Sequence, residues 1–195
     1  MKKAVRYVVL FMVMTLCLST VHAAASRKGS STQEDYKKLW TEHFVWSQSY
    51  IVSEMEDLDD RDAVLNRLLK NQEDIGVSIS PYLGEKGTAQ VTALLKDHIL
   101  LAGKMIKAAK NGEKETVAQE RKKWYENANE LAAVLSEANP RWQEKTLQNI
   151  LHIHLEHMEN YISARIIRDW EAEITAADES LVHMQKLADY LAEKN

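Results

Sequence analysis

Apolar side chains recur every three or four residues along most of the chain, a spacing that predicts α-helices almost from end to end. The first stripe includes Tyr36, Trp40 and Ile51, and the last ends at Leu191. The expected helices cover 31 to about 56, 59 or 60 to 79, 88 to about 110, about 114 to 137, about 141 to 161, and 167 to 191.

Helix-breaking residues separate these segments. Ser31, followed three residues later by Glu34, predicts a capping box that opens the first helix. No strong breaker lies between Tyr161 and Ala164, so the last two segments could be two helices or one bent rod. The other expected breaks are the Pro- and Gly-containing stretch 80–87, Asn111-Gly112 and Asn139-Pro140.

The short connections favour antiparallel packing of successive helices. The chain has 195 residues with only 6 Gly and 2 Pro, and such a shortage of turn formers argues against a β-rich fold. We therefore predict one all-α domain. Its expected architecture is an antiparallel helical bundle of four long helices plus one or two further helical segments.

The N-terminus has the pattern of a secretory signal peptide. Lys2, Lys3 and Arg6 precede an apolar run over 8–18. Val21-His22-Ala23 then place small or modest side chains at the cleavage site, and Ala23 or Ala25 is the expected last residue removed. A retained membrane anchor is the alternative, but the run is shorter than the ~20 residues that a span needs. We expect a signal peptide over 1–23, a flexible leader over 24–31 and the bundle over 32–195. The protein is then exported, periplasmic or extracellular, without a stable membrane span.

The net charge and the cysteine content exclude some classes of partner and of chemistry. The formal net charge of the chain is −4, and loss of three positive residues with the signal peptide makes the mature protein more acidic. An acidic protein disfavours nucleic acid as a partner. Cys17 is the only cysteine and lies within the signal peptide, so the mature protein uses no disulfide or thiolate chemistry.

Four ionisable residues occupy positions where helical spacing predicts core residues: His43, His98, His154 and Asp178. Imidazole and carboxylate are metal ligands, and a buried unpaired carboxylate would be destabilising. Three His and one Asp suit Zn, Fe or Mn, with an open position for water or a small ligand. The alternative is that each histidine is hydrogen-bonded within the core and binds nothing. Further candidate ligand-binding residues lie near the same stripes: Trp40, Asn71, Asp74 and Asn127.

Other catalytic signatures are absent from the sequence. No Glu-x-x-His pair of the ferritin-like kind occurs, and neither a phosphate-binding glycine loop nor a G-x-S-x-G nucleophile turn is present. His154 and His157 can share one helix face and form the better local chelate. Catalysis by a His and Asp acid–base pair is a third hypothesis, but binding, storage or sensing is favoured over an enzyme.

Several longer motifs run through the chain: Leu39-Trp40-x-x-His43-x-x-Trp46, Arg67-Leu68-Leu69-Lys70-Asn71-Gln72-x-Asp74-Ile75-Gly76, Leu94-Leu95-Lys96-x-His98-Ile99, Trp124-Tyr125-x-Asn127-Ala128, Asn139-Pro140 and His154-Leu155. Together they resemble a family of small bacterial all-α proteins, over nearly all of residues 36–190. Members often carry the automatic names acetylglutamate kinase or glycosyltransferase, but both activities require α/β nucleotide-binding folds, which this sequence does not predict. The family pattern has an acidic residue near Asn129, a departure that argues against a carboxylate role there.

The sequence thus predicts an exported bundle that binds a transition metal or a small ligand in a buried pocket lined by His and Asp. The alternative is a structural or protein-interaction module of the cell envelope, in which the histidines serve only the core. The two differ in whether rings from separate helices come together in the interior.

Overall fold

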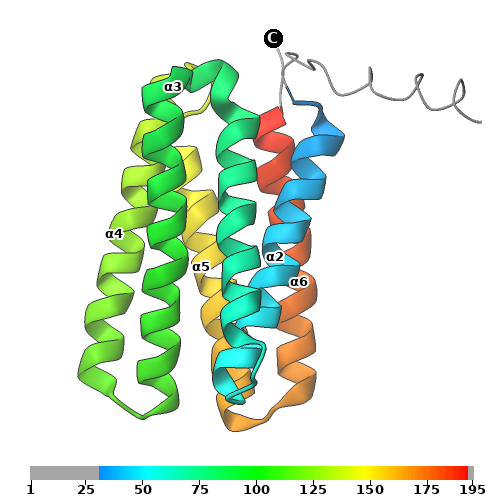
Figure 1. Cartoon of the computed structure of the whole chain (residues 1–195), viewed down its shortest axis with the longest axis vertical. Coiled ribbons are helices and arrows are strands. Elements are labelled where there is room, and N and C mark those ends of the chain that lie inside the picture. The colour runs from blue at the N-terminus through cyan, green and yellow to red at the C-terminus, as the bar shows by residue number, and fades with distance from the viewer. Residues whose placement is uncertain (1–30, 193–195) are drawn as a thin grey trace, which may run out of the picture.

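The computed structural model describes residues 31–192, and every regular element in this range is an α-helix. The predicted all-α helical bundle is confirmed (Figure 1). The predicted signal peptide, most of the leader and Cys17 lie outside the described residues. The helices are α2 (Gln33–Met55), α3 (Arg61–Lys110), α4 (Lys114–Ala138), α5 (Glu144–Ile167) and α6 (Trp170–Ala192).

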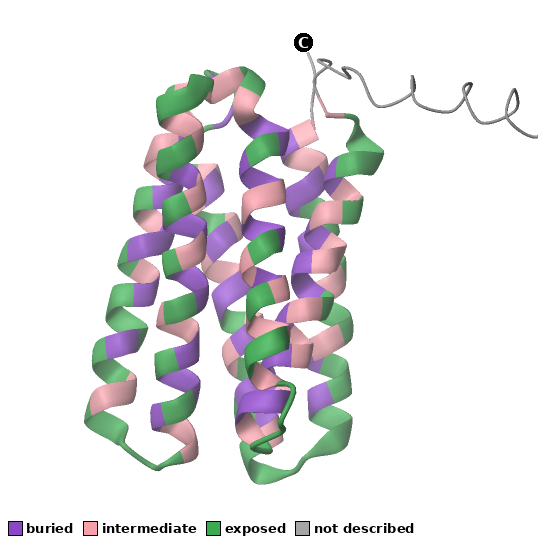
Figure 2. Cartoon of the chain, viewed as in Figure 1, coloured by how far each residue is buried: buried purple, intermediate pink, exposed green. Residues whose placement is uncertain are grey.

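The helices form a closed ring around one core. Packing contacts join α2 to α3, α3 to α4, α4 to α5, α5 to α6, and α6 back to α2. Polar contacts reinforce the closure, because Asp189 of α6 accepts a hydrogen bond from Gln33 Nε2 of α2 at 2.6 Å and pairs with Lys37 at 3.0 Å. Buried positions line the inward faces of the helices (Figure 2). No helix within 31–192 is long and apolar enough to cross a membrane.

The 50-residue element α3 is two helices joined by a sharp turn at Gly84. Gly84 has φ 64° and ψ −176°, a conformation that is open essentially to glycine alone. The two halves run up and down the bundle as neighbours (Figure 1). The predicted break within 80–87 is therefore present, but the first half continues through Pro81 to the glycine.

Replacing Gly84 with Ala should destabilise the bundle by about 1–2 kcal/mol, because the backbone strain outweighs the smaller entropy of the unfolded alanine chain. An added Cβ would meet no atom within 4 Å, so the effect is conformational and not steric. Urea unfolding measures it. Glu85→Ala, at an exposed neighbouring position, is the control and should change stability by less than about 0.5 kcal/mol. Equal stability of the two variants would contradict this explanation of the turn.

The caps refine the predicted helix ends. Thr32 and Asp35 form the capping box of α2: the Thr32 hydroxyl accepts from Asp35 N, and Asp35 accepts from Thr32 N. The prediction of Ser31 and Glu34 was therefore wrong by one residue, and Ser31 donates instead to the carbonyl of Ser78. Arg168, in the left-handed conformation at φ 59°, separates α5 from α6, which settles that these are two helices.

The predicted inward face of α6 was wrong in its first half. Trp170 and Ile174 are 50% and 62% exposed, whereas Glu173 is buried. Glu173 turns inward because its carboxylate pairs with the guanidinium of Arg165 at 2.7 Å, with both side chains about nine-tenths buried. The same rotation of the helix leaves Asp178 exposed, so the prediction of an inward carboxylate there was also wrong.

Candidate functional site

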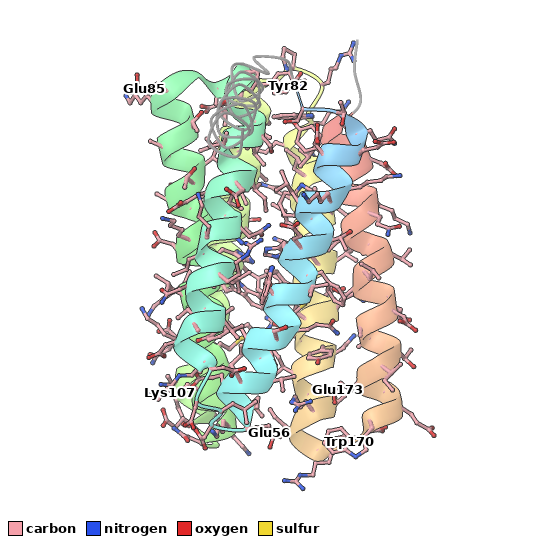
Figure 3. All side chains as sticks on the ribbon, turned by 45° about the vertical axis from the view of Figure 1, so that its right-hand side comes forward. Glu56, Tyr82, Glu85, Lys107, Trp170 and Glu173 are labelled. Atoms are coloured by element: carbon pink, nitrogen blue, oxygen red, sulfur yellow. The ribbon has the colours of Figure 1, made fainter. Side chains whose placement is uncertain are left out.

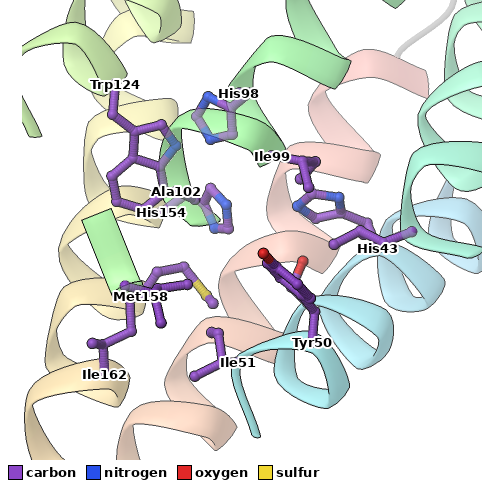
Figure 4. Close-up of a pocket in the computed structure, with 13 residues that line it drawn as sticks. His43, Tyr50, Ile51, His98, Ile99, Ala102, Trp124, His154, Met158 and Ile162 are labelled. Atoms are coloured by element: carbon purple, nitrogen blue, oxygen red, sulfur yellow. The ribbon is translucent and has the colours of Figure 1, made fainter. Parts of the chain in front are cut away.

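Three buried histidines from three helices lie together in the core (Figure 4). His43 comes from α2, His98 from the second half of α3, and His154 from α5. The ring centroid of His154 is 5.6 Å from that of His43 and 6.2 Å from that of His98. Rings predicted to face inward from separate helices therefore share one site near mid-height of the bundle.

The ring of His98 is held by an amide. Its Nδ1 lies 2.8 Å from Oδ1 of Asn127, whose Nδ2 donates to the carbonyl of Leu94 at 3.1 Å. Since that second bond fixes the amide orientation, Oδ1 must accept and His98 Nδ1 must carry the proton. His98 Nε2 is then left with its lone pair. Second-shell hydrogen bonds of this kind orient metal-binding histidines in many proteins.

A second amide faces His43. Gln72 Nε2 lies 3.2 Å from His43 Nδ1, and it also donates to the carbonyl of Leu68 and to Oδ1 of Asn71, both at 3.0 Å. Asn71 is fixed in turn by donating to the carbonyl of Leu39. The two hydrogens of this amide nitrogen are shared among three acceptors, and the nitrogen cannot itself accept a hydrogen bond, so His43 Nδ1 presents its lone pair and the proton of the neutral ring lies on Nε2. Asn71 and Asn127 thus act behind the rings and not inside the cavity.

The pKa values of all three rings are lowered. Burial is the main cause: together with the nearby ring of His98 it lowers the pKa of His43 from 6.5 to about 3, against a raising effect of the Gln72 contact. Burial likewise lowers the pKa of His98 to about 4. Burial and the surrounding rings lower the pKa of His154 well below 6.5. The three imidazoles are therefore neutral at physiological pH, the form in which a histidine binds metal.

The three rings line an internal cavity of ≈ 30 Å³. This volume holds one or two water molecules or a single ion. It is far below the ~300 Å³ of a pocket for a small organic ligand. Two polar atoms of the lining residues are buried without a hydrogen-bond partner, Nδ1 of His154 and Nε1 of Trp124. The thirteen lining residues include no Asp, Glu, Lys or Arg.

The remaining predicted site residues have other positions. Trp40 packs edge-on against His43, with ring centroids 5.6 Å apart, and so forms part of the surroundings of the rings. Asp74 pairs with Lys70 at 3.2 Å near the surface and does not line the cavity. Asp178 is exposed and also lies outside the lining. Within residues 31–192, no group of three or more His, Cys, Asp or Glu side chains is arranged to hold a metal ion as the side chains stand.

A second pair of rings lies beside the cavity. His157 of α5 and His183 of α6 have centroids 5.5 Å apart, and both affect the pKa of His154. His183 Nε2 contacts the carbonyl of Ile150 at 2.7 Å. His157 Nδ1 is 3.5 Å from a carboxylate oxygen of Glu179, too long for a good hydrogen bond. This pair is closer to the surface than the three-histidine cavity, since Glu179 is exposed.

Sequence reasoning missed three contributors to the site. Gln72 lies on the apolar stripe of its helix and was not recognised as a partner of His43, although a buried amide was the available signal. Met158 and Tyr50 both line the cavity but occupy ordinary core positions, so the helical pattern gave no hint of a special role.

Comparison with family models, with curated proteins and with solved structures gave no match. The resemblance to the bacterial helical family therefore stays a prediction.

Proposed function

We propose that this chain is an exported binding protein that holds one transition-metal ion in the cavity between His43, His98 and His154. The observation that carries the proposal is the enclosure of an ion-sized space by three neutral imidazoles from three helices. Export rests on the N-terminal sequence pattern alone.

The sequence left open whether the ligand is a metal ion or a small organic molecule, and the volume of the cavity bears on that choice. A space of ≈ 30 Å³ favours an ion over an organic molecule. The lone pair of His98 Nε2 is available to bind it, and the neutral ring of His154, whose Nδ1 has no hydrogen-bond partner, supplies a second nitrogen with a lone pair. The His43 ring would have to exchange its proton to become a third ligand, because Gln72 faces its Nδ1.

Binding is favoured over catalysis because the cavity lacks the groups that a reaction needs. The lining holds no carboxylate to act as a base beside the weakly basic buried histidines, and the space for an organic substrate is small. Storage, delivery or sensing of an ion requires neither.

The alternative, a protein-interaction module of the cell envelope, is favoured by a different observation. Ile167, Trp170 and Ile174 are near one another in sequence and are 73%, 50% and 62% exposed. Trp170 lies at the end of the bundle where α5 and α6 meet (Figure 3). Such a role is compatible with an ion in the core, but it predicts no effect of the buried histidines on binding.

The purified mature protein should take up one equivalent of a transition metal, and His98→Gln should lose most of that uptake. The measurement is elemental analysis after incubation with Zn, Fe, Mn or Cu and removal of free metal. His152→Gln is the matched control, since His152 is also bonded to an asparagine oxygen, that of Asn129 at 2.8 Å, but lies outside the cavity. Its uptake should equal that of the unmodified protein.

Circular dichroism establishes that each variant is folded, and His154→Gln provides a second removal of a cavity ligand. A folded, unmodified protein that binds none of the four metals would contradict the proposed function. Equal uptake by His98→Gln, His154→Gln and His152→Gln would place the metal somewhere other than the cavity.

A further inference from the structure

The cavity contains one more potential ligand, the thioether of Met158. Met158 is one helical turn after His154 on α5, is buried, and lines the same cavity. Its sulfur-bearing end is directed toward the same space as the rings of His154 and Tyr50 (Figure 4). The sulfur also accepts a weak hydrogen bond from Ser180 Oγ at 3.6 Å, which limits its freedom.

The other polar groups around the cavity carry no charge. The Tyr50 hydroxyl stays protonated, because burial and then the nearby carboxylate of Glu54 raise the pKa of Tyr50 to about 12. Ser47 adds a neutral hydroxyl, and the remaining lining is hydrocarbon or indole. An ion bound here would therefore keep its full charge in an apolar interior.

This lack of charge compensation discriminates between ions. The cost of transferring an ion from water into a medium of low dielectric constant grows with the square of its charge, so a divalent ion costs about four times as much as a monovalent ion of similar size. Zn, Fe and Mn bind as divalent ions, and Mn prefers carboxylate oxygens, which the cavity lining lacks. A monovalent metal ion fits better.

The donor atoms of the cavity also favour a monovalent metal ion. A thioether is a soft ligand that selects monovalent copper, and imidazole also binds copper well. Monovalent copper accepts low coordination numbers, so it does not require the set of three His or carboxylate ligands that the described residues lack. We propose that the cavity binds monovalent copper through His98 Nε2, a nitrogen of His154 and the sulfur of Met158. This inference rests on the proposed function and names its ion.

The test is a competition titration of the mature protein, without oxygen, against a chromogenic chelator of known affinity for monovalent copper. We expect one copper per chain, bound more tightly than Zn(II) measured in a parallel titration. Met158→Leu, which conserves volume, should weaken copper binding by about tenfold or more and leave Zn(II) binding unchanged. Met184→Leu is the matched control: Met184 is fully buried on α6 but does not line the cavity, so copper binding should not change.

X-ray absorption at the copper edge detects the atoms bonded to copper and does not depend on the stability of the fold. We expect a sulfur neighbour in the unmodified protein and its loss in Met158→Leu. Zn(II) bound as tightly as copper, or unchanged copper affinity in Met158→Leu, would overturn this inference and leave the proposed function standing. Binding of neither ion would overturn this inference, and absence of Fe and Mn binding as well would overturn the proposed function.

Discussion

Lowering the pH from 7 to 4.5 should bring the metal-free bundle to the edge of unfolding, and the cavity histidines should cause much of that loss. An unfolded histidine has a pKa of about 6.5, whereas burial lowers the pKa of folded His43 to about 3 and of folded His98 to about 4. Between these values the unfolded chain binds protons that the folded chain does not. The free energy of unfolding therefore falls as the pH falls through 6.5.

The size of this effect is large compared with the stability of an ordinary domain. At pH 4.5, two pH units below the unfolded pKa, His43 and His98 each lower the free energy of unfolding by about 2–3 kcal/mol. His154 acts in the same direction. A loss of about 5 kcal/mol or more compares with a typical total of 5–15 kcal/mol.

Urea unfolding at pH 7 and at pH 4.5 measures the loss in each variant. His98→Gln removes one of the titrating groups and should reduce the pH-dependent loss by about 2–3 kcal/mol, whatever the variant's stability at pH 7. His152→Gln, outside the cavity, should reproduce the pH dependence of the unmodified protein. The same loss in both variants would mean that the cavity ring of His98 is not held neutral by burial.

Removing the buried carboxylate of Glu173 should destabilise the bundle by about 3 kcal/mol. Its partner, Arg165, is only 12% exposed, and without Glu173 it keeps only the weaker pairing with Glu56, which is 43% exposed, so much of its desolvation cost is no longer offset. Glu173→Gln tests this by urea unfolding at pH 7. Glu56 provides a matched control, because it pairs with the same guanidinium at 3.2 Å but is 43% exposed. Glu56→Gln should cost less than about 1 kcal/mol.

A double replacement separates loss of a favourable contact from exposure of an unpaired charge. Changing both Arg165 and Glu173 to Leu should recover most of the stability lost in Glu173→Gln, because no buried charge remains. If Glu173→Gln and Glu56→Gln are equally mild, the buried pair does not determine the orientation of α6.

Most of the fold followed from helical periodicity because the core face of each helix is apolar over many turns. The break near Gly84 was also predictable, since Pro and Gly cluster there. The register of the first half of α6 was not predictable, because an acidic residue, Glu173, occupies a core position. Only its spatial partner Arg165, eight residues earlier on another helix, explains that burial.

The capping error at α2 has a simple cause. Ser31 with Glu34 and Thr32 with Asp35 both satisfy the spacing of a capping box, and spacing alone does not choose between them. A shift of one residue is small for the fold, but it determines which hydroxyl is free to contact Ser78.

The candidate site, like the fold, was predictable from the sequence only in part. The inward positions of His43, His98 and His154 follow from helical spacing, because each lies on an apolar stripe. Their mutual distances, the cavity volume and the fixing of His98 by Asn127 depend on how three helices pack, which spacing does not specify. Asp178 was misassigned because it depended on the α6 register.

The most direct test of metal binding in the cavity is anomalous X-ray diffraction from two crystals of the mature protein, one loaded with monovalent copper and one with Zn(II). Our account predicts an anomalous peak inside the cavity, within bonding distance, ~2.0–2.2 Å, of imidazole nitrogens of His98 and His154 in at least one crystal. An interior without a peak in both crystals, or peaks only at the outer His157 and His183 pair, would contradict it.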